Sequence, residues 1–398
     1  MRRLVSILVS MALPSLHGTL SAQTFVVDAA GGPGTNFTSI AAAVAAVPDG
    51  ARLLVRPGTY AAFTVHQKGL TILGDPGAAV LGTARFENSL ANQTTVFAGF
   101  TLLQPPNALY GLSIADCLGL VAITDITGPP VVQPLPPTFG GFSSFPASLA
   151  VLNCSQLVLR DSSLFYVVLN QSTVLIDSCI LRGCTGTTII GLPVSATQAL
   201  ATNNADVRIV GATQLHGGGS GASGLTPGEA LRTFQGTVRM LDGLLASGPA
   251  VPYAVPAAVI FQATLLLDPR VVVQSTATPP IYGGATVTPM PMVVSTNAPP
   301  GGTMVATVAT AAGDAVALCA AQPAAPWSLP GSTDALWLDP VTASVRALAV
   351  QQSAAPVTAS IVLPTSTSLA GAAIAWQAFA WNASSAFVLT NPSLAIVR

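Results

Sequence analysis

Charged side chains are scarce in this sequence of 398 residues. Asp, Glu, Lys and Arg together make up 7% of the chain, Lys68 is its single lysine, and the formal net charge is -1. Binding to nucleic acid requires several Lys or Arg side chains in one place, because they neutralise the phosphates. No such basic cluster occurs, so we expect no nucleic-acid partner.

Long apolar runs are also missing beyond the first residues, although 51% of the chain is hydrophobic. A membrane-spanning helix needs about 18 or more consecutive apolar residues, so we expect no transmembrane span. The apolar residues instead form short runs between turn residues, among them 36 glycines and 32 prolines. This pattern is typical of a β-rich chain with many turns.

Clusters of metal-binding residues are the third absence. The chain has 3 histidines and 5 cysteines, and no two cysteines form a CxxC pair, so we expect neither a metal site nor a cofactor. Because the number of cysteines is odd, at least one of them has no partner within the chain. Cys179 and Cys184 either form a bridge across a turn or fill the core as small apolar side chains, and we favour the second interpretation.

Residues 1–23 have the pattern of a signal peptide. Arg2 and Arg3 form a positively charged start, residues 4–13 are apolar, and the small residues Ser21 and Ala22 precede the expected cleavage site. We therefore expect a secreted or cell-surface protein.

The next segment, residues 24–75, predicts a strand at 25–28, a helix at 38–47 with Thr38 as its N-cap, and three short strands. The stretch VDAAGGPGTNFTSIAAAVAAVPDGARLLVRPGTY, followed by KGLTILGD, resembles the opening segment of the pectin-lyase-like superfamily of right-handed parallel β-helices, which includes the pectinesterases. The resemblance implies that fold, with the helix lying across the open end of the first coil. There it would shield apolar side chains and strand edges from water.

A short unit then recurs, consisting of a polar residue, an apolar strand, and an Asp or Gly. It is found at 117–125, 153–161, 170–177, 204–211, 235–242 and 262–268. A single coil cannot bury its inner face, so such repeats stack. We predict an all-β chain with a right-handed parallel β-helix at 24–298 and a β-sandwich-like module of short strands at 299–398. Asn153, Asn170 and Asn204 lie at turns, where they are candidates for a stacked ladder.

Carboxylates are the groups that polysaccharide-cleaving β-helices require, either as acid and base or as calcium ligands. Most aspartates here recur singly at coil corners, where an Asp side chain binds the backbone of its own turn. Asp161 and Asp177 are the catalytic candidates, because one coil apart they would pair on an exposed face. The acidic motifs that the resemblance implies for pectinesterases and polygalacturonases are absent, and His216 lies in a Gly-rich loop where we expect it to be solvated.

Aromatic side chains are the candidates for binding. Phe139, Phe142 and Phe145 share a Pro- and Gly-rich insertion at 128–148. They either stack on sugar rings or fold back over the coil beneath them, and we favour the second interpretation.

These observations favour a secreted, non-enzymatic β-helix protein that binds polysaccharide or a cell-surface component. One alternative is a divergent carbohydrate-active enzyme, a polysaccharide lyase or a pectinesterase-like carbohydrate esterase, with its site near Asp161 and Asp177. Another is a structural or adhesive stalk. Acidic and basic side chains that converge in one groove would favour the enzyme.

Overall fold

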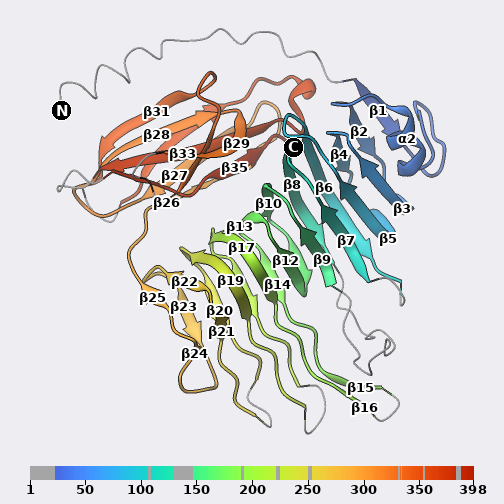
Figure 1. Cartoon of the computed structure of the whole chain (residues 1–398). Helices are drawn as coiled ribbons and strands as arrows, with labels where there is room; N and C mark the ends of the chain where they lie inside the picture. The colour runs from blue at the N-terminus through green and yellow to red at the C-terminus, as the bar shows by residue number, and fades with distance from the viewer. Residues whose placement is uncertain are drawn as a thin grey trace. The chain divides into compact units, whose positions relative to one another are not determined.

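The computed structural model describes residues 23–105, 109–128, 147–189, 192–220, 225–249, 253–329, 332, 334–352, 355–381 and 387–398. They form two compact units, Gln23–Thr288 and Pro289–Arg398, each with a core of its own. Within these ranges α2 (Ile40–Ala46) is the only α-helix, and nearly all other regular elements are strands (Figure 1). A mostly β chain, with one large parallel sheet followed by smaller antiparallel sheets, is therefore confirmed.

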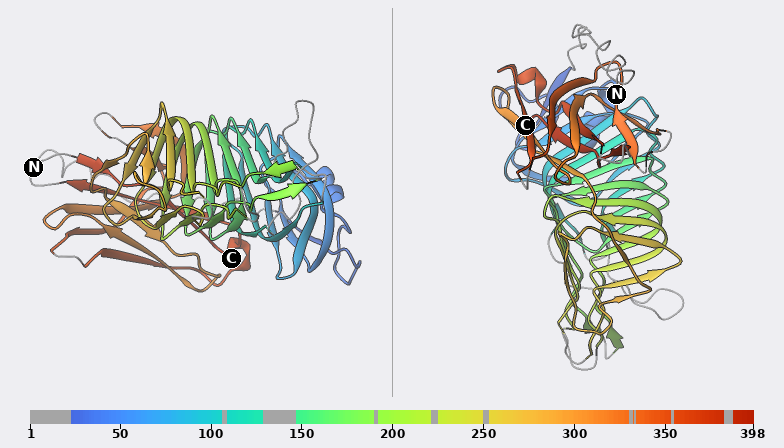
Figure 2. Two further views of the ribbon diagram at one scale, coloured as in Figure 1. Left: turned by 90° about the horizontal axis from the view of Figure 1, so that it is seen from below. Right: turned by 90° about the vertical axis from the view of Figure 1, so that its left-hand side faces the viewer.

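The unit Gln23–Thr288 is a stack of coils whose strands pair in parallel, each with a strand one coil later in the chain (Figure 2). The first ladder contains β1 (Thr24–Val27), β2 (Arg52–Val55), β4 (Thr71–Gly74), β6 (Thr94–Leu103), β8 (Leu120–Thr127), β10 (Gln156–Arg160), β13 (Thr173–Asp177), β17 (Leu200–Val210), β19 (Leu231–Met240), β22 (Thr264–Leu267) and β25 (Thr286–Val287). The second contains β3 (Gly58–His66), β5 (Ala78–Glu87), β7 (Tyr110–Ala115), β9 (Ala147–Leu152), β12 (Val167–Asn170), the same β17 and β19, β21 (Ala258–Phe261) and β24 (Ile281–Tyr282). The third contains β11 (Ser163–Phe165), β14 (Ile180–Arg182), β18 (Gln214–His216), β20 (Leu244–Ala246) and β23 (Val272–Gln274). A separate antiparallel pair is formed by β15 (Thr187–Ile189) and β16 (Leu192–Val194).

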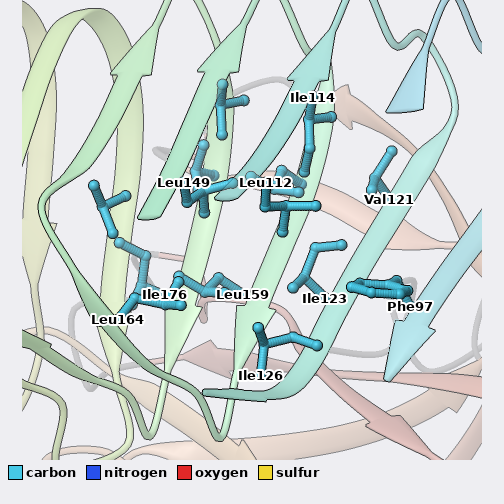
Figure 3. Close-up of a cluster of buried hydrophobic side chains, with 14 of the residues drawn as sticks. Phe97, Leu112, Ile114, Val121, Ile123, Ile126, Leu149, Leu159, Leu164 and Ile176 are labelled. Carbon is cyan, nitrogen blue, oxygen red and sulfur yellow. The ribbon is translucent and has the colours of Figure 1, made fainter. Parts of the chain in front are cut away.

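Apolar side chains stack directly above one another inside the coils (Figure 3). Because neighbouring strands are in register, one inward position repeats along the first ladder as the buried series Leu53, Ile72, Phe97, Ile123, Leu159, Ile176, Ile209, Met240 and Leu267. Burial of each such side chain away from water contributes about 1.5–3 kcal/mol to the stability of the folded chain. No coil buries its inner face alone, so stacking is what stabilises this unit.

A polar corner joins the second ladder to the first. One residue per coil has a positive φ there, between 46° and 58°, in the series Asn88, Asp116, Asn153, Gln171, Asn204, Gln235 and Gln262. Asn and Asp tolerate this left-handed conformation better than most residues. The predicted ladder of Asn153, Asn170 and Asn204 is thus wrong at one position, since Asn170 is the last residue of β12 and Gln171 occupies the corner.

The helix α2 packs its buried residues Ile40, Ala43 and Val44 into the core of the coils. Its N-cap is Ser39, whose Oγ accepts a hydrogen bond from the Ala42 N–H at 3.2 Å, and not the predicted Thr38. Carbonyl groups at the C-terminal end of the helix accept hydrogen bonds from Lys68, the only lysine of the chain.

Lys68 lies in the turn between β3 and β4. Its Nζ donates hydrogen bonds to the carbonyl oxygens of Val44 at 2.7 Å and Val47 at 2.8 Å. A cation at this position also interacts favourably with the negative end of the helix dipole.

The cysteines act as core residues. All five are buried and none is in a disulfide, so Cys179 and Cys184 form no bridge. Cys117 and Cys154 each follow a residue of the polar corner, and the Cys154 N–H donates to Ser172 Oγ at 3.0 Å. Small inward-facing side chains thus line the inside of this corner.

The strands of the unit Pro289–Arg398 pair antiparallel within the described residues, and one isolated bridge, between Ala298 and Val397, is parallel. One sheet contains β26 (Met292–Ser295), β27 (Thr303–Ala309) and β32 (Val357–Val362), and a second contains β31 (Ser344–Val350), β28 (Ala315–Ala321), β33 (Ala373–Trp381), β34 (Phe387–Leu389) and β35 (Ser393–Ile396). A third pairs β29 (Pro323–Ser328) with β30 (Ala335–Leu338), and a short 3-10 helix, η1 (Thr367–Leu369), precedes β33. Residues of both larger sheets share one core around Trp376. The strand β26 belongs to this unit, although the sequence placed it in the β-helix at 24–298.

Candidate functional site

Asp161 and Asp177 come together at a second corner of the coils, with Arg160 between them. Arg160 ends β10 and is the register partner of Asp177, the last residue of β13. Arg160 Nε lies 3.4 Å from Asp161 Oδ2 and 3.6 Å from Asp177 Oδ2. The sequence therefore predicted correctly that the two aspartates are neighbours one coil apart.

The two carboxylates do not share an exposed face. The side chain of Asp161 is 38% exposed, whereas that of Asp177 is 1% exposed and that of Arg160 5%. Burial raises the pKa of Asp177, while the Arg160 guanidinium and a hydrogen bond from Ser178 Oγ oppose the rise. A carboxyl group enclosed in this way cannot touch a polymer lying on the surface, which weakens the catalytic interpretation.

A shallow polar concavity lies at the polar corner described above. Its volume is about 440 Å³, and it is lined by Asn153, Gln171, Ser172, Thr173, Asn204 and Asp206. The corner residues come from three successive coils, because Leu152, Asn170 and Asn203, which precede them, are register partners. All the lining residues therefore stand on paired strands or on the tight turns between them.

The side chains of this polar concavity supply amide, hydroxyl and carboxylate groups. Asn153, Gln171 and Asn204 are exposed. The Asn153 amide donates from Nδ2 to Asp116 Oδ1 at 2.8 Å, which sets the orientation of that side chain. Amides that both donate and accept hydrogen bonds suit a ligand rich in hydroxyl groups.

The charge of Asp206 is balanced by two arginines on its own and the next coil. Asp206 Oδ2 lies 3.0 Å from Arg208 Nη1, and Asp206 Oδ1 lies 2.7 Å from Arg239 Nη1. Arg208 is 3% exposed and Arg239 18%, so both guanidinium groups are largely withdrawn from solvent. Asp206 therefore serves as an oriented hydrogen-bond acceptor at the edge of the concavity.

The remaining predicted residues are three phenylalanines and His216. Phe139, Phe142 and Phe145 lie outside the described residues. His216 ends β18 and is half-buried, with Nε2 3.1 Å from Gln214 Oε1, and burial lowers the pKa of its imidazole. The expectation of a solvated His216 is therefore wrong.

Two further absences concern the part of the chain that the structure describes. No group of three or more His, Cys, Asp or Glu side chains there is arranged to hold a metal ion. No helix in those ranges is long and apolar enough to cross a membrane.

Sequence reasoning missed Gln171 and Asp206 as surface residues. A signal for the first was available, because the units at 153, 204, 235 and 262 start with the polar residue that the structure places at the corner, and Gln171 directly follows the start of the unit 170–177. For Asp206 no such signal existed, since the unit 204–211 does not show which face of the strand carries it.

Comparison with known proteins gives no match to a protein family and none to a curated protein. Among solved structures the chain is similar to full-length tailspike protein 2 from Escherichia coli O157:H7 bacteriophage CAB120, with a TM-score of 0.27 and 11% sequence identity. The similarity covers 83% of this chain and 57% of the tailspike, so the chain spans little more than half the tailspike's length. A TM-score this low supports no argument about function.

Proposed function

We propose that this chain is an exported right-handed parallel β-helix with a C-terminal β-sandwich module, and that it binds polysaccharide or another cell-surface component without cleaving it. Parallel strands joined coil by coil support the fold, because crossover connections between parallel strands are almost always right-handed. Two antiparallel sheets around one core support the sandwich. The arginine pair at the N-terminus followed by an apolar run supports export.

The observation that carries the binding function is the polar concavity lined by Asn153, Gln171 and Asn204. Its side chains project from backbone fixed by the ladders on both sides, so little conformational entropy is lost when a ligand is bound. Its openness to solvent suits a polymer that lies along the surface rather than a small molecule that is enclosed. Its polar groups match the hydroxyl groups of a glycan.

The experiment removes one side chain at a time without disturbing the corner. Gln171→Gly and Asn204→Gly keep a residue that adopts a positive φ freely, while they delete the amide. Asn88→Gly is the matched control, because Asn88 has the same corner conformation with a φ of 58° but lies outside the concavity. Binding is measured on a glycan array and by affinity electrophoresis of the purified protein.

We expect each of the two variants to bind its glycan about fivefold more weakly than the wild type, as the loss of a hydrogen bond worth about 1 kcal/mol implies. The control should bind as the wild type does. Equal binding by all the variants would show that the concavity is not the site. An array on which the wild type binds no glycan would refute the function itself.

The enzymatic alternative rests on one observation, the proximity of Asp161 and Asp177 around Arg160. The guanidinium group occupies the space between the carboxylates in which an acid and a base would act on a substrate. We therefore assign this triad to the stability of the corner.

A further inference from the structure

An exposed aromatic row runs across three successive coils of the second ladder. It consists of Phe234 on β19, Phe261 on β21 and Tyr282 on β24, which are 48%, 37% and 58% exposed. The ring centroids of Phe234 and Phe261 are 5.1 Å apart, and those of Phe261 and Tyr282 are 6.3 Å apart. The rings thus form one continuous aromatic surface.

This aromatic row does not continue along the preceding coils of the second ladder. Phe234 and Phe261 are register partners, and the equivalent positions on the preceding coils carry Asn203 and Asn170. An aromatic side chain stabilises a structure most when it is removed from water. Three such side chains held at the surface of neighbouring coils therefore indicate a binding surface.

The residues next to the aromatic row indicate which class of ligand it can bind. Gln235 and Gln262 follow the two phenylalanines at the polar corner, so amide groups border the rings. A pyranose ring presents an apolar face of C–H groups and an edge of hydroxyl groups, which matches flat rings bordered by amides. β19 carries two arginines, and each is paired with a carboxylate: Arg232, two residues before Phe234, with Glu229, and Arg239, five residues after it, with Asp206. A border whose charges are balanced in ion pairs favours a neutral sugar over a uronic acid.

We propose that the aromatic row of Phe234, Phe261 and Tyr282 is a stacking site for a neutral glycan. This inference rests on the proposed function and names both the surface and the class of sugar. The polar concavity lies at the same corner on earlier coils, since Asn203, which precedes Asn204, is the register partner of Phe234. A single linear glycan can therefore contact both surfaces.

The test is affinity electrophoresis of the whole protein in gels that contain one soluble polymer each. Hydroxyethylcellulose, a neutral β-linked glucan derivative, is compared with polygalacturonate. The variants are Phe234→Ala, Phe261→Ala and the double variant. Leu81→Ala is the matched control, because Leu81 is an apolar side chain 50% exposed on β5, far from the row in sequence and on an early coil. Far-UV circular dichroism checks that each variant is folded.

We expect the wild type to be retarded by the neutral polymer, and each Phe→Ala substitution to weaken this binding about tenfold, as the loss of a stacked ring implies. The Leu81→Ala variant should behave as the wild type. Retention of full binding by the folded double variant would overturn the assignment of the aromatic row, while the proposed function would stand.

Other outcomes separate the remaining explanations. Retardation by polygalacturonate alone would overturn the neutral class of sugar but not the function. A wild type that binds neither polymer nor any array glycan would refute both proposals. Sedimentation analysis that shows a dimer of the wild type, dissociated by the double variant, would identify the aromatic row as a contact between copies of the chain and would overturn the assignment.

Discussion

Asp177 is the buried carboxyl group whose replacement tests the interpretation of the Asp161–Arg160–Asp177 triad. It is 1% exposed, and burial, the largest influence on it, raises its pKa above the usual 3.8 despite Arg160 at 3.6 Å. Between the unfolded pKa and the higher folded pKa, the folded protein keeps a proton that the unfolded chain releases. The stability that Asp177 contributes is therefore fully present below the unfolded pKa and is lost as pH rises through the folded pKa.

The perturbation is Asp177→Asn, which keeps the shape of the side chain but does not titrate. The stability of the wild type relative to this variant should fall between about pH 3 and about pH 7.5, by about 1.4 kcal/mol for each unit by which folding raises the pKa. The assay is urea unfolding followed by circular dichroism at both pH values. Asp161→Asn is the companion, because the side chain of Asp161 is 38% exposed and its removal should cost about 1 kcal/mol or less.

If the stability of the wild type relative to Asp177→Asn increased as the pH rises, this reasoning would be refuted. It would mean that the attraction of Arg160 outweighs the cost of burial and that the folded pKa lies below the unfolded one. The carboxylate would then be held ionised, as a base or a cation ligand requires, and the enzymatic alternative would gain support.

The remaining predictions concern the packing of the coils. Phe97→Ala should lower the free energy of unfolding by about 3–5 kcal/mol, because Phe97 is fully buried with its ring centroid 4.4 Å from that of Phe100; a loss under about 1 kcal/mol in urea unfolding would contradict the packing. Val44→Asp should place an uncompensated charge in the contact between α2 and the core, and cause aggregation or a clearly lower Tm; unchanged melting and solubility would show that the helix does not cover apolar residues. Lys68→Met should cost about 1–2 kcal/mol by leaving the last carbonyl groups of α2 without their donor, and a Tm equal to that of the wild type would contradict this role.

The opening segment was the most predictable part of the fold, because its signals are local. Apolar spacing over 38–47 and the stop at Pro48 predicted a helix that the structure places at Ile40–Ala46. The choice of Ser39 over Thr38 as N-cap was not predictable, since both side chains can cap a helix and only the geometry of the turn decides between them.

The corner aspartates illustrate what periodicity leaves open. Repeat units placed Asp161 and Asp177 one coil apart, which register confirms. Burial depends on which side of the turn each residue occupies. Asp161 has a φ of 47° and its side chain is 38% exposed at the corner, whereas Asp177 is the last residue of β13 and its side chain is 1% exposed. A one-residue difference of this kind is invisible when units are aligned only by their apolar strands.

The aromatic row was missed for a different reason. Sequence reasoning sought aromatic residues close together in the chain, as in Phe139, Phe142 and Phe145. Phe234 and Phe261 are a whole coil apart and meet only because their strands are register partners. The shared Phe-Gln step at 234–235 and 261–262 was the available signal, and aligning the repeat units on their corner residue would have revealed it.

The central claim is that this protein binds a glycan without cleaving it, and one paired measurement tests it most directly. The purified protein is incubated with each polysaccharide that retards it in affinity electrophoresis, and newly formed reducing ends, unsaturated products and released ester groups are followed over time. The account predicts retardation with no product above the rate of a protein-free control. Product that accumulates with the wild type, and disappears in a folded Asp161→Asn or Asp177→Asn variant, would contradict it.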